Sequence, residues 1–139
     1  MINKIEHIGI AVKNLNDSNK LFEALFGTSH YKIESVESEG VNTSFFKLGE
    51  NKIELLEATN DSGPIAKFIA KKGEGIHHIA FDVDDIEAEI KRLKGEGFKV
   101  LNEVPKKGAD NKLVAFLHPK SSNGVLVELC QEINDKKSC

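Results

Sequence analysis

One stretch of the chain occurs twice. Residues 5–12, Ile-Glu-His-Ile-Gly-Ile-Ala-Val, are echoed by residues 76–83, Ile-His-His-Ile-Ala-Phe-Asp-Val, with His7 aligned on His78. The same shift aligns apolar positions further on, such as Phe22 on Leu93. A repeat of this length indicates duplicated supersecondary units, so it constrains the fold before any single element is assigned.

A second echo lies later in each copy. Residues 52–56, Lys-Ile-Glu-Leu-Leu, match residues 126–130, Leu-Val-Glu-Leu-Cys, with Glu54 aligned on Glu128. Each copy therefore contributes one imidazole and one carboxylate. Halves of about 60–70 residues are marginal when alone, so the copies are expected to share a core. We predict one domain over residues 1–139, with module one at about 1–58, a linker helix at about 59–74 and module two at about 75–133.

The apolar periodicity predicts the same order of elements in both modules, strand, helix and three strands, which is an α+β fold. In module one the strands are expected at 5–12, 31–36, 41–48 and 52–57, with a helix capped within 16–18 and ended by Gly27. In module two they are expected at 76–83, 99–103, 112–118 and 125–131, with a helix at 86–94, a loop at 105–111 and a disordered end at 134–139.

Composition excludes several classes of function. Hydrophobic residues at 40% and charged residues at 29% are globular values, and no apolar run approaches the ~20 residues of a membrane span. The formal charge of −3 comes from interspersed charges, so neither nucleic acid nor a membrane is an expected partner. Two cysteines without Cys-x-x-Cys spacing fit a reduced compartment, and we expect a cytoplasmic protein.

Strand alternation places the repeated ionisable residues on one face. Each of the two glutamates is flanked by aliphatic residues that point to the opposite side of its strand. If these aliphatic rows pack on the helices, the concave face of the sheet carries four ionisable side chains, which are His7, Glu54, His78 and Glu128. His77 is expected on the outer face or beside a ligand, and His30 and His118 are expected to be ordinary surface and strand-end residues.

Taken singly, each of the four residues has a simpler structural explanation. A buried His is more often hydrogen-bonded core than a ligand, and a strand Glu more often faces water. Four ionisable groups on an inner face are costly, however, unless something charged lies among them. Two nitrogens and two oxygens suit one divalent ion such as Zn, Ni, Co or Mn, with open positions for water or substrate.

The segments at 52–56, 64–68, 73–79 and 118–129 resemble the vicinal oxygen chelate superfamily, and within it the methylmalonyl-CoA epimerase family. The resemblance implies two βαβββ modules that form a cradle of mixed sheets around one divalent metal ion. It implies His7, Glu54, His78 and Glu128 as the metal ligands and a homodimer as the assembly. The substrate it implies is a small acyl-CoA.

The implied reaction is removal of a proton next to a carbonyl through a metal-stabilised enolate. Glu128 is the first candidate for the catalytic base and Glu54 the second. At Thr43, where some bacterial epimerases carry a glutamate, this chain has no carboxylate. Lactoylglutathione lyase (glyoxalase I), acting on a glutathione adduct, shares the fold and the ligand pattern and is the alternative; metal-free binding or resistance proteins and dioxygenases of the superfamily fit the four residues less well.

Overall fold

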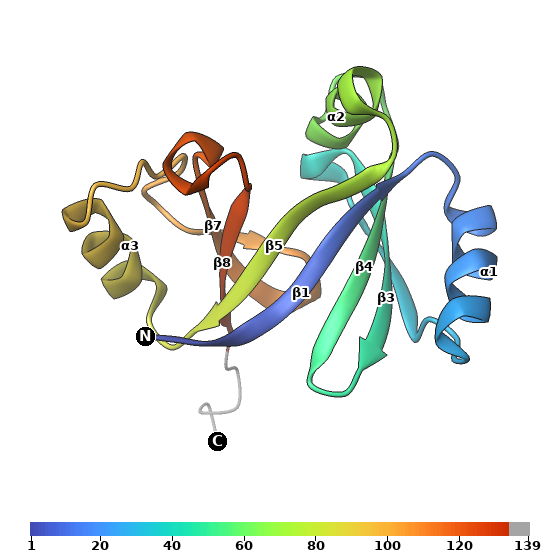
Figure 1. Ribbon diagram of the computed structural model, residues 1–139, viewed down its shortest axis with the longest axis horizontal. Coiled ribbons are helices and arrows are strands. Elements are labelled where there is room, and N and C mark those ends of the chain that lie inside the picture. The colour runs from blue at the N-terminus through green and yellow to red at the C-terminus, as the bar shows by residue number, and fades with distance from the viewer. Residues whose placement is uncertain (134–139) are drawn as a thin grey trace. The chain divides into compact units, whose positions relative to one another are not determined.

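The computed structural model describes residues 1–133, and the predicted disorder of residues 134–139 lies outside that range. Within it the chain forms eight strands and three α-helices (Figure 1). The helices are α1 (Leu15–Phe26), α2 (Pro64–Lys72) and α3 (Ile86–Gly95). The strands are β1 (Ile2–Val12), β2 (Lys32–Val36), β3 (Val41–Leu48), β4 (Asn51–Ala58), β5 (Gly75–Val83), β6 (Lys106–Gly108), β7 (Lys112–Leu117) and β8 (Val127–Glu132). None of the helices in this part of the chain is both long and apolar enough to span a bilayer.

The chain divides into two compact units. The N-terminal unit is His7–His78, and the C-terminal unit joins Met1–Glu6 to the chain from Ile79 onward. The long strands β1 and β5 therefore run from one unit into the other. The strand order is β2-β3-β4-β1-β5 up to β5 and β5-β8-β7-β6 beyond it.

In the N-terminal unit, β1 pairs with β4 in parallel, and β3 pairs with β4 and with β2 in antiparallel fashion. Helix α1 packs Phe22 and Phe26 against a cluster that includes Leu55 of β4. The side chain of Asn14 caps α1 by accepting a hydrogen bond from the backbone N–H of Asp17. The predicted cap within residues 16–18 is thus one turn too late, because the helix already begins at the buried Leu15. The predicted stop at Gly27, with φ 72°, is confirmed.

The other face of this sheet packs against α2. Ile65 of α2 lies in a cluster with Ala11 of β1, Val41 of β3 and Leu56 of β4. The aliphatic row of β4 that includes Leu55 packs toward α1, so Glu54 points to the side that carries α2. The expected separation of the two faces is confirmed for this unit.

The C-terminal unit repeats the arrangement. Strand β5 pairs with β8 in parallel, and β7 pairs with β8 and β6 in antiparallel fashion. Helix α3, capped by the side chain of Asp85, packs Ile86 and Ile90 on a cluster that contains Leu129.

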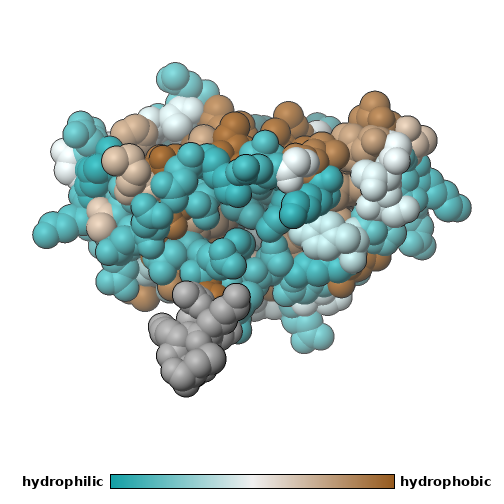
Figure 2. All heavy atoms as spheres, turned by 90° about the horizontal axis from the view of Figure 1, so that it is seen from below, coloured by the Kyte–Doolittle hydropathy of each residue, from teal (hydrophilic) through white to brown (hydrophobic). Residues whose placement is uncertain are grey.

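The face of the molecule shown in Figure 2 is covered mainly by hydrophilic side chains, with hydrophobic ones gathered along its upper edge.

The predicted strand at 99–103 is wrong, and β6 lies instead within the predicted loop. Only Val100 makes a strand-like bridge, to Leu117. The side chain of Asn102 accepts a hydrogen bond from the N–H of Phe116 at 2.8 Å and donates to the carbonyl of Val114 at 3.3 Å. Two backbone bonds join this segment to β7, from the N–H of Leu101 to the carbonyl of Phe116 and from the N–H of His118 to the carbonyl of Lys99. Beyond Leu101 the side chain of Asn102 takes the place of the ladder, which apolar alternation cannot reveal.

Candidate metal centre

Three of the four predicted ligands come together within the N-terminal unit. His7 is on β1, Glu54 on the neighbouring β4, and His78 near the start of β5. Only 5%, 5% and 6% of their respective surfaces are exposed. Ionisable side chains are seldom buried to this degree without partners, so their mutual contacts define the site.

The two imidazoles face each other through their Nε2 atoms. These atoms lie 2.9 Å apart, and the rings meet edge to face at an interplanar angle of 85°. On its other side His7 places Nδ1 3.1 Å from Oε2 of Glu54. A carboxylate can only accept, so His7 donates through Nδ1 and its Nε2 lone pair is directed at Nε2 of His78.

This geometry fits a bound divalent ion. Two nitrogens that bind one ion with bonds of about 2.1 Å at a right angle lie about 3.0 Å apart, whereas tetrahedral ligands lie about 3.4 Å apart. The observed 2.9 Å between the Nε2 atoms matches neighbouring ligands of an ion with more than four positions. Glu54 contacts the nitrogen of His7 on the side of the ring away from Nε2, and so orients this imidazole from behind.

Glu128 lies in the C-terminal unit, on β8, and is 7% exposed. It pairs across the parallel β5–β8 ladder with Ala80, two residues after His78. Glu54 pairs in the same way with Gly9, two residues after His7. The two copies thus share not only sequence but strand register, and Glu128 occupies in its unit the place of Glu54.

Two further residues contact the His78 ring. Gly9 was not predicted to take part in the site, and His77 was predicted only to lie on the outer face or beside a ligand. His77, half-buried, places its Nδ1 3.0 Å from Nδ1 of His78 and meets the ring of Phe68 edge to face. Gly9 lies under the His78 ring, where a Cβ would come within 2.2 Å of Cε1. A glycine inside a strand pattern is the available signal for such a close approach.

The other histidines lie elsewhere, as expected. His30 contacts Glu23 at 2.6 Å through Nδ1. His118 directly follows β7 and accepts a hydrogen bond from the N–H of Lys120 at 3.0 Å. Thr43 is buried on β3 opposite Leu56, so the sheet has no carboxylate at that position.

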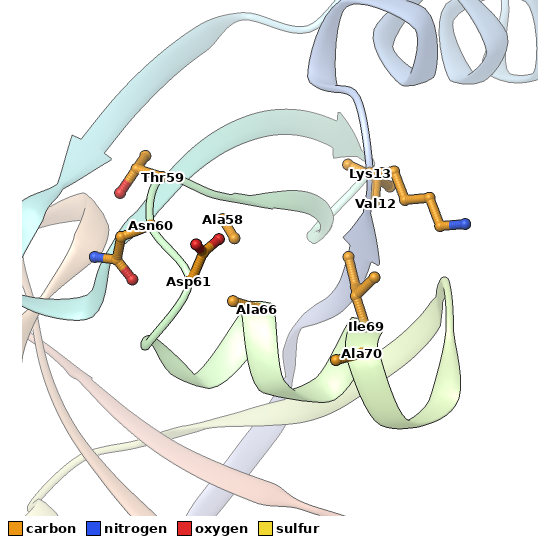
Figure 3. A pocket seen from close by; sticks show the side chains of 9 residues that line it. All are labelled: Val12, Lys13, Ala58, Thr59, Asn60, Asp61, Ala66, Ile69 and Ala70. Atoms are coloured by element: carbon orange, nitrogen blue, oxygen red, sulfur yellow. The ribbon is translucent and has the colours of Figure 1, made fainter.

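A pocket of about 410 Å³ opens elsewhere in the N-terminal unit (Figure 3). It is lined by Val12 and Lys13 at the end of β1, by the segment 58–61, and by Ala66 and Ile69 of α2. None of the predicted ligands lines it, so this cavity is distinct from the space around the two imidazoles.

Comparison with known proteins identifies the superfamily of this chain. The model of the Glyoxalase/Bleomycin resistance protein/Dioxygenase superfamily matches residues 6–116. A solved structure of a hypothetical protein from Bacillus halodurans C-125 is 44% identical with a TM-score of 0.92, covering 95% of this chain and 96% of that one. The chain belongs to this superfamily, and the predicted α+β fold class is confirmed.

Relatives with a named activity narrow the class further. The mitochondrial methylmalonyl-CoA epimerase of Dictyostelium discoideum is 44% identical over 129 residues, which are 92% of this chain and 78% of that protein. A structure of the Streptomyces coelicolor methylmalonyl-CoA epimerase in complex with 2-nitronate-propionyl-CoA is 34% identical with a TM-score of 0.91, covering 95% of this chain and 96% of that one. Within the superfamily, the chain is therefore similar to methylmalonyl-CoA epimerases over nearly its whole length.

Proposed function

We propose that the protein is a divalent-metal-dependent methylmalonyl-CoA epimerase. The observation that carries the proposal is the buried pair of imidazoles, with Nε2 atoms 2.9 Å apart and Glu54 on Nδ1 of His7. This arrangement occurs in a chain that is similar to epimerases over nearly its whole length. A site for a cation and a likeness to epimerases are independent supports for the same reaction.

The proposed ligand set is His7, Glu54, His78 and Glu128. His7 and His78 are supported by their facing Nε2 atoms. Glu54 is included from the family resemblance and lies next to His7. Glu128 is supported by the repeat, because its register on β8 matches that of Glu54 on β4. Two imidazoles and two carboxylates suit Co, Ni, Zn or Mn.

The substrate class is an acyl-CoA with an acidic carbon between two carbonyl groups. The Streptomyces coelicolor relative binds 2-nitronate-propionyl-CoA. A nitronate is a planar anion with its negative charge on oxygen, and in these two respects it resembles the enolate that loss of the α-proton would form. A divalent ion, when bound, would supply Lewis-acid stabilisation of that charge.

The chain's own residues then handle the proton. Epimerisation requires removal of the proton from one face of the carbon and its return to the other. We assign removal to the carboxylate of Glu128, which becomes protonated, and return to Glu54, which must hold a proton when the substrate binds; after turnover the proton passes from Glu128 back to Glu54 through water. The hydroxyl of Thr43 is not acidic at neutral pH, so Thr43 cannot replace a glutamate as acid or base. The proposed reaction therefore uses no carboxylate from β3. The low exposure of Glu54 and Glu128, 5% and 7%, limits exchange with bulk water.

Metal analysis of the purified protein and two assays test the proposal. Turnover of methylmalonyl-CoA should require a divalent ion and should be lost together with metal binding in His78→Ala. Turnover of the methylglyoxal–glutathione hemithioacetal, without action on methylmalonyl-CoA, would instead assign lactoylglutathione lyase activity. Full epimerase activity of His78→Ala without metal would refute the mechanism. Light scattering tests the homodimer that the family suggests.

A further inference from the structure

The imidazole of His78 is held by two residues outside the proposed ligand set. His77 contacts its Nδ1 at 3.0 Å, and Gly9 lies against its ring. We propose that His77 and Gly9 are positioning residues that fix the His78 ring with Nε2 directed at Nε2 of His7. The inference rests on the proposed function, because ring orientation matters here only if His78 is a ligand.

The Nδ1 atoms of His77 and His78 contact each other. One of them donates and the other accepts, so the tautomers of the two rings are linked. A histidine that binds an ion through Nε2 carries its proton on Nδ1, and in that tautomer of His78 the acceptor is Nδ1 of His77. Metal-ligating histidines commonly have such a partner, which fixes both tautomer and ring orientation.

His77 is itself held by an aromatic contact with Phe68. Its ring centroid lies 5.0 Å from that of Phe68 on α2, with an interplanar angle of 85°. The rings of His77 and His78 are 5.2 Å apart and perpendicular. Edge-to-face contacts of this kind prefer a defined ring orientation. Helix α2 therefore fixes His77, and His77 in turn fixes His78.

The His78 ring occupies the space next to Gly9. A Cβ at this position would lie 2.2 Å from Cε1, 2.6 Å from Nδ1 and 2.8 Å from Nε2 of His78, all closer than real Cβ atoms approach other heavy atoms. Gly9 is not among the glycines with positive φ, so its backbone conformation does not require glycine. A glycine within a strand is destabilising by roughly 0.5–1 kcal/mol relative to alanine. Room for the His78 ring is thus the reason for glycine at this position.

Four variants test the inference. His77→Leu removes the nitrogen, whereas His77→Asn places an amide group where Nδ1 was and should restore the contact. Gly9→Ala introduces the obstructing methyl group. Gly95→Ala, at the end of α3, is the matched control, because a Cβ there has nothing within 4 Å. Thermal unfolding verifies that each variant folds. If Gly9→Ala does not fold, the comparison of His77→Leu with His77→Asn still tests the inference.

The main measurement is Co²⁺ affinity by competition with a chelator. Loss of a partner behind a metal ligand typically lowers affinity about 10–100-fold, and we expect this for His77→Leu, with a loss at the upper end for Gly9→Ala. His77→Asn should recover most of the affinity, and Gly95→Ala should match the wild type. NMR of the metal-free protein should show sharp His78 ring signals in the wild type and broadened ones in His77→Leu.

Two outcomes overturn the inference, and they can be told apart. If the wild type binds Co²⁺ and both His77→Leu and Gly9→Ala bind it equally well, the positioning role is wrong while the proposed function stands. If the wild type binds no Co²⁺ and His78→Ala behaves identically, the proposed metal function fails and the positioning role fails with it.

Discussion

Replacing Glu54 with glutamine separates the charge of this residue from its shape. The Glu54 side chain is 6% exposed and places Oε2 3.1 Å from Nδ1 of His7. Its neighbours across the sheet are Gly9 on β1 and Phe45 on β3. A glutamine fits the same space and can accept the same hydrogen bond through its amide oxygen, but it has no negative charge.

The magnitude of the effect follows from these contacts. A hydrogen bond to a charged group contributes about 1.5–3 kcal/mol, against about 0.5–1.5 kcal/mol for a neutral one. The loss in orienting His7 is then about 1–1.5 kcal/mol, or about tenfold in metal affinity. Loss of a carboxylate ligand adds to this, so we expect about 10–100-fold weaker metal binding. Without metal, stability should change by less than about 1 kcal/mol, because the desolvation cost of a buried charge offsets much of its attraction.

The assay compares two variants in parallel. Metal affinity is measured by chelator competition, and stability of the metal-free protein by urea unfolding. Glu23→Gln is the matched control, since Glu23 contacts Nδ1 of His30 at 2.6 Å in the same unit, with both side chains 29% exposed. It should leave metal affinity unchanged. A Glu54→Gln variant that binds metal normally but loses more than about 3 kcal/mol of stability would show that Glu54 is structural and refute the reasoning.

Three further predictions concern the C-terminal unit. The pKa of Glu89 is lowered from 4.5 to about 2, chiefly by its hydrogen bond with Arg92. Because the unfolded chain binds more protons than the folded one in this range, the stability that Glu89 contributes is present above pH 4.5 and is lost as the pH falls toward 2. Urea unfolding measured against pH should show a smaller loss in Arg92→Gln. The ammonium group of Lys112 lies 3.7 Å from the buried carboxylate of Glu6. Lys112→Met removes this cation and should lower the free energy of unfolding by about 3 kcal/mol, and the double variant with Glu6→Gln should recover part of that loss. Full stability of the single variant would contradict this. Asp85→Ala removes the cap of α3 and should lower stability by about 1 kcal/mol in the same measurement.

The repeat carried most of what could be predicted from the sequence. A pattern of alternating apolar residues reports which side of a strand faces the core, and it placed Glu54 correctly opposite the row that packs on α1. Alternation reports nothing about bonds between side chains and backbone. Asn102 uses such bonds to hold the segment that was expected to be a strand. The contacts of Gly9 and His77 depend on how rings stack in three dimensions, so a spacing rule cannot supply them.

The two copies of the repeat are equal in register but not in the support they give their histidines. The position two residues after His7 is Gly9, which leaves room for the ring of His78. The equivalent position after His78 is Ala80, whose methyl group is fully buried in a cluster with Val114. The glycine in the first copy therefore leaves the space in which the two imidazoles approach each other.

The partners of the two imidazoles differ as well. His7 donates to the carboxylate of Glu54, while His78 contacts the imidazole of His77. A carboxylate behind a ligating histidine makes it a stronger electron donor than a neutral imidazole does. Removing Glu54 should thus weaken metal binding more than removing the His77 nitrogen. The reverse order would mean that position, and not electron donation, governs the strength of both ligands.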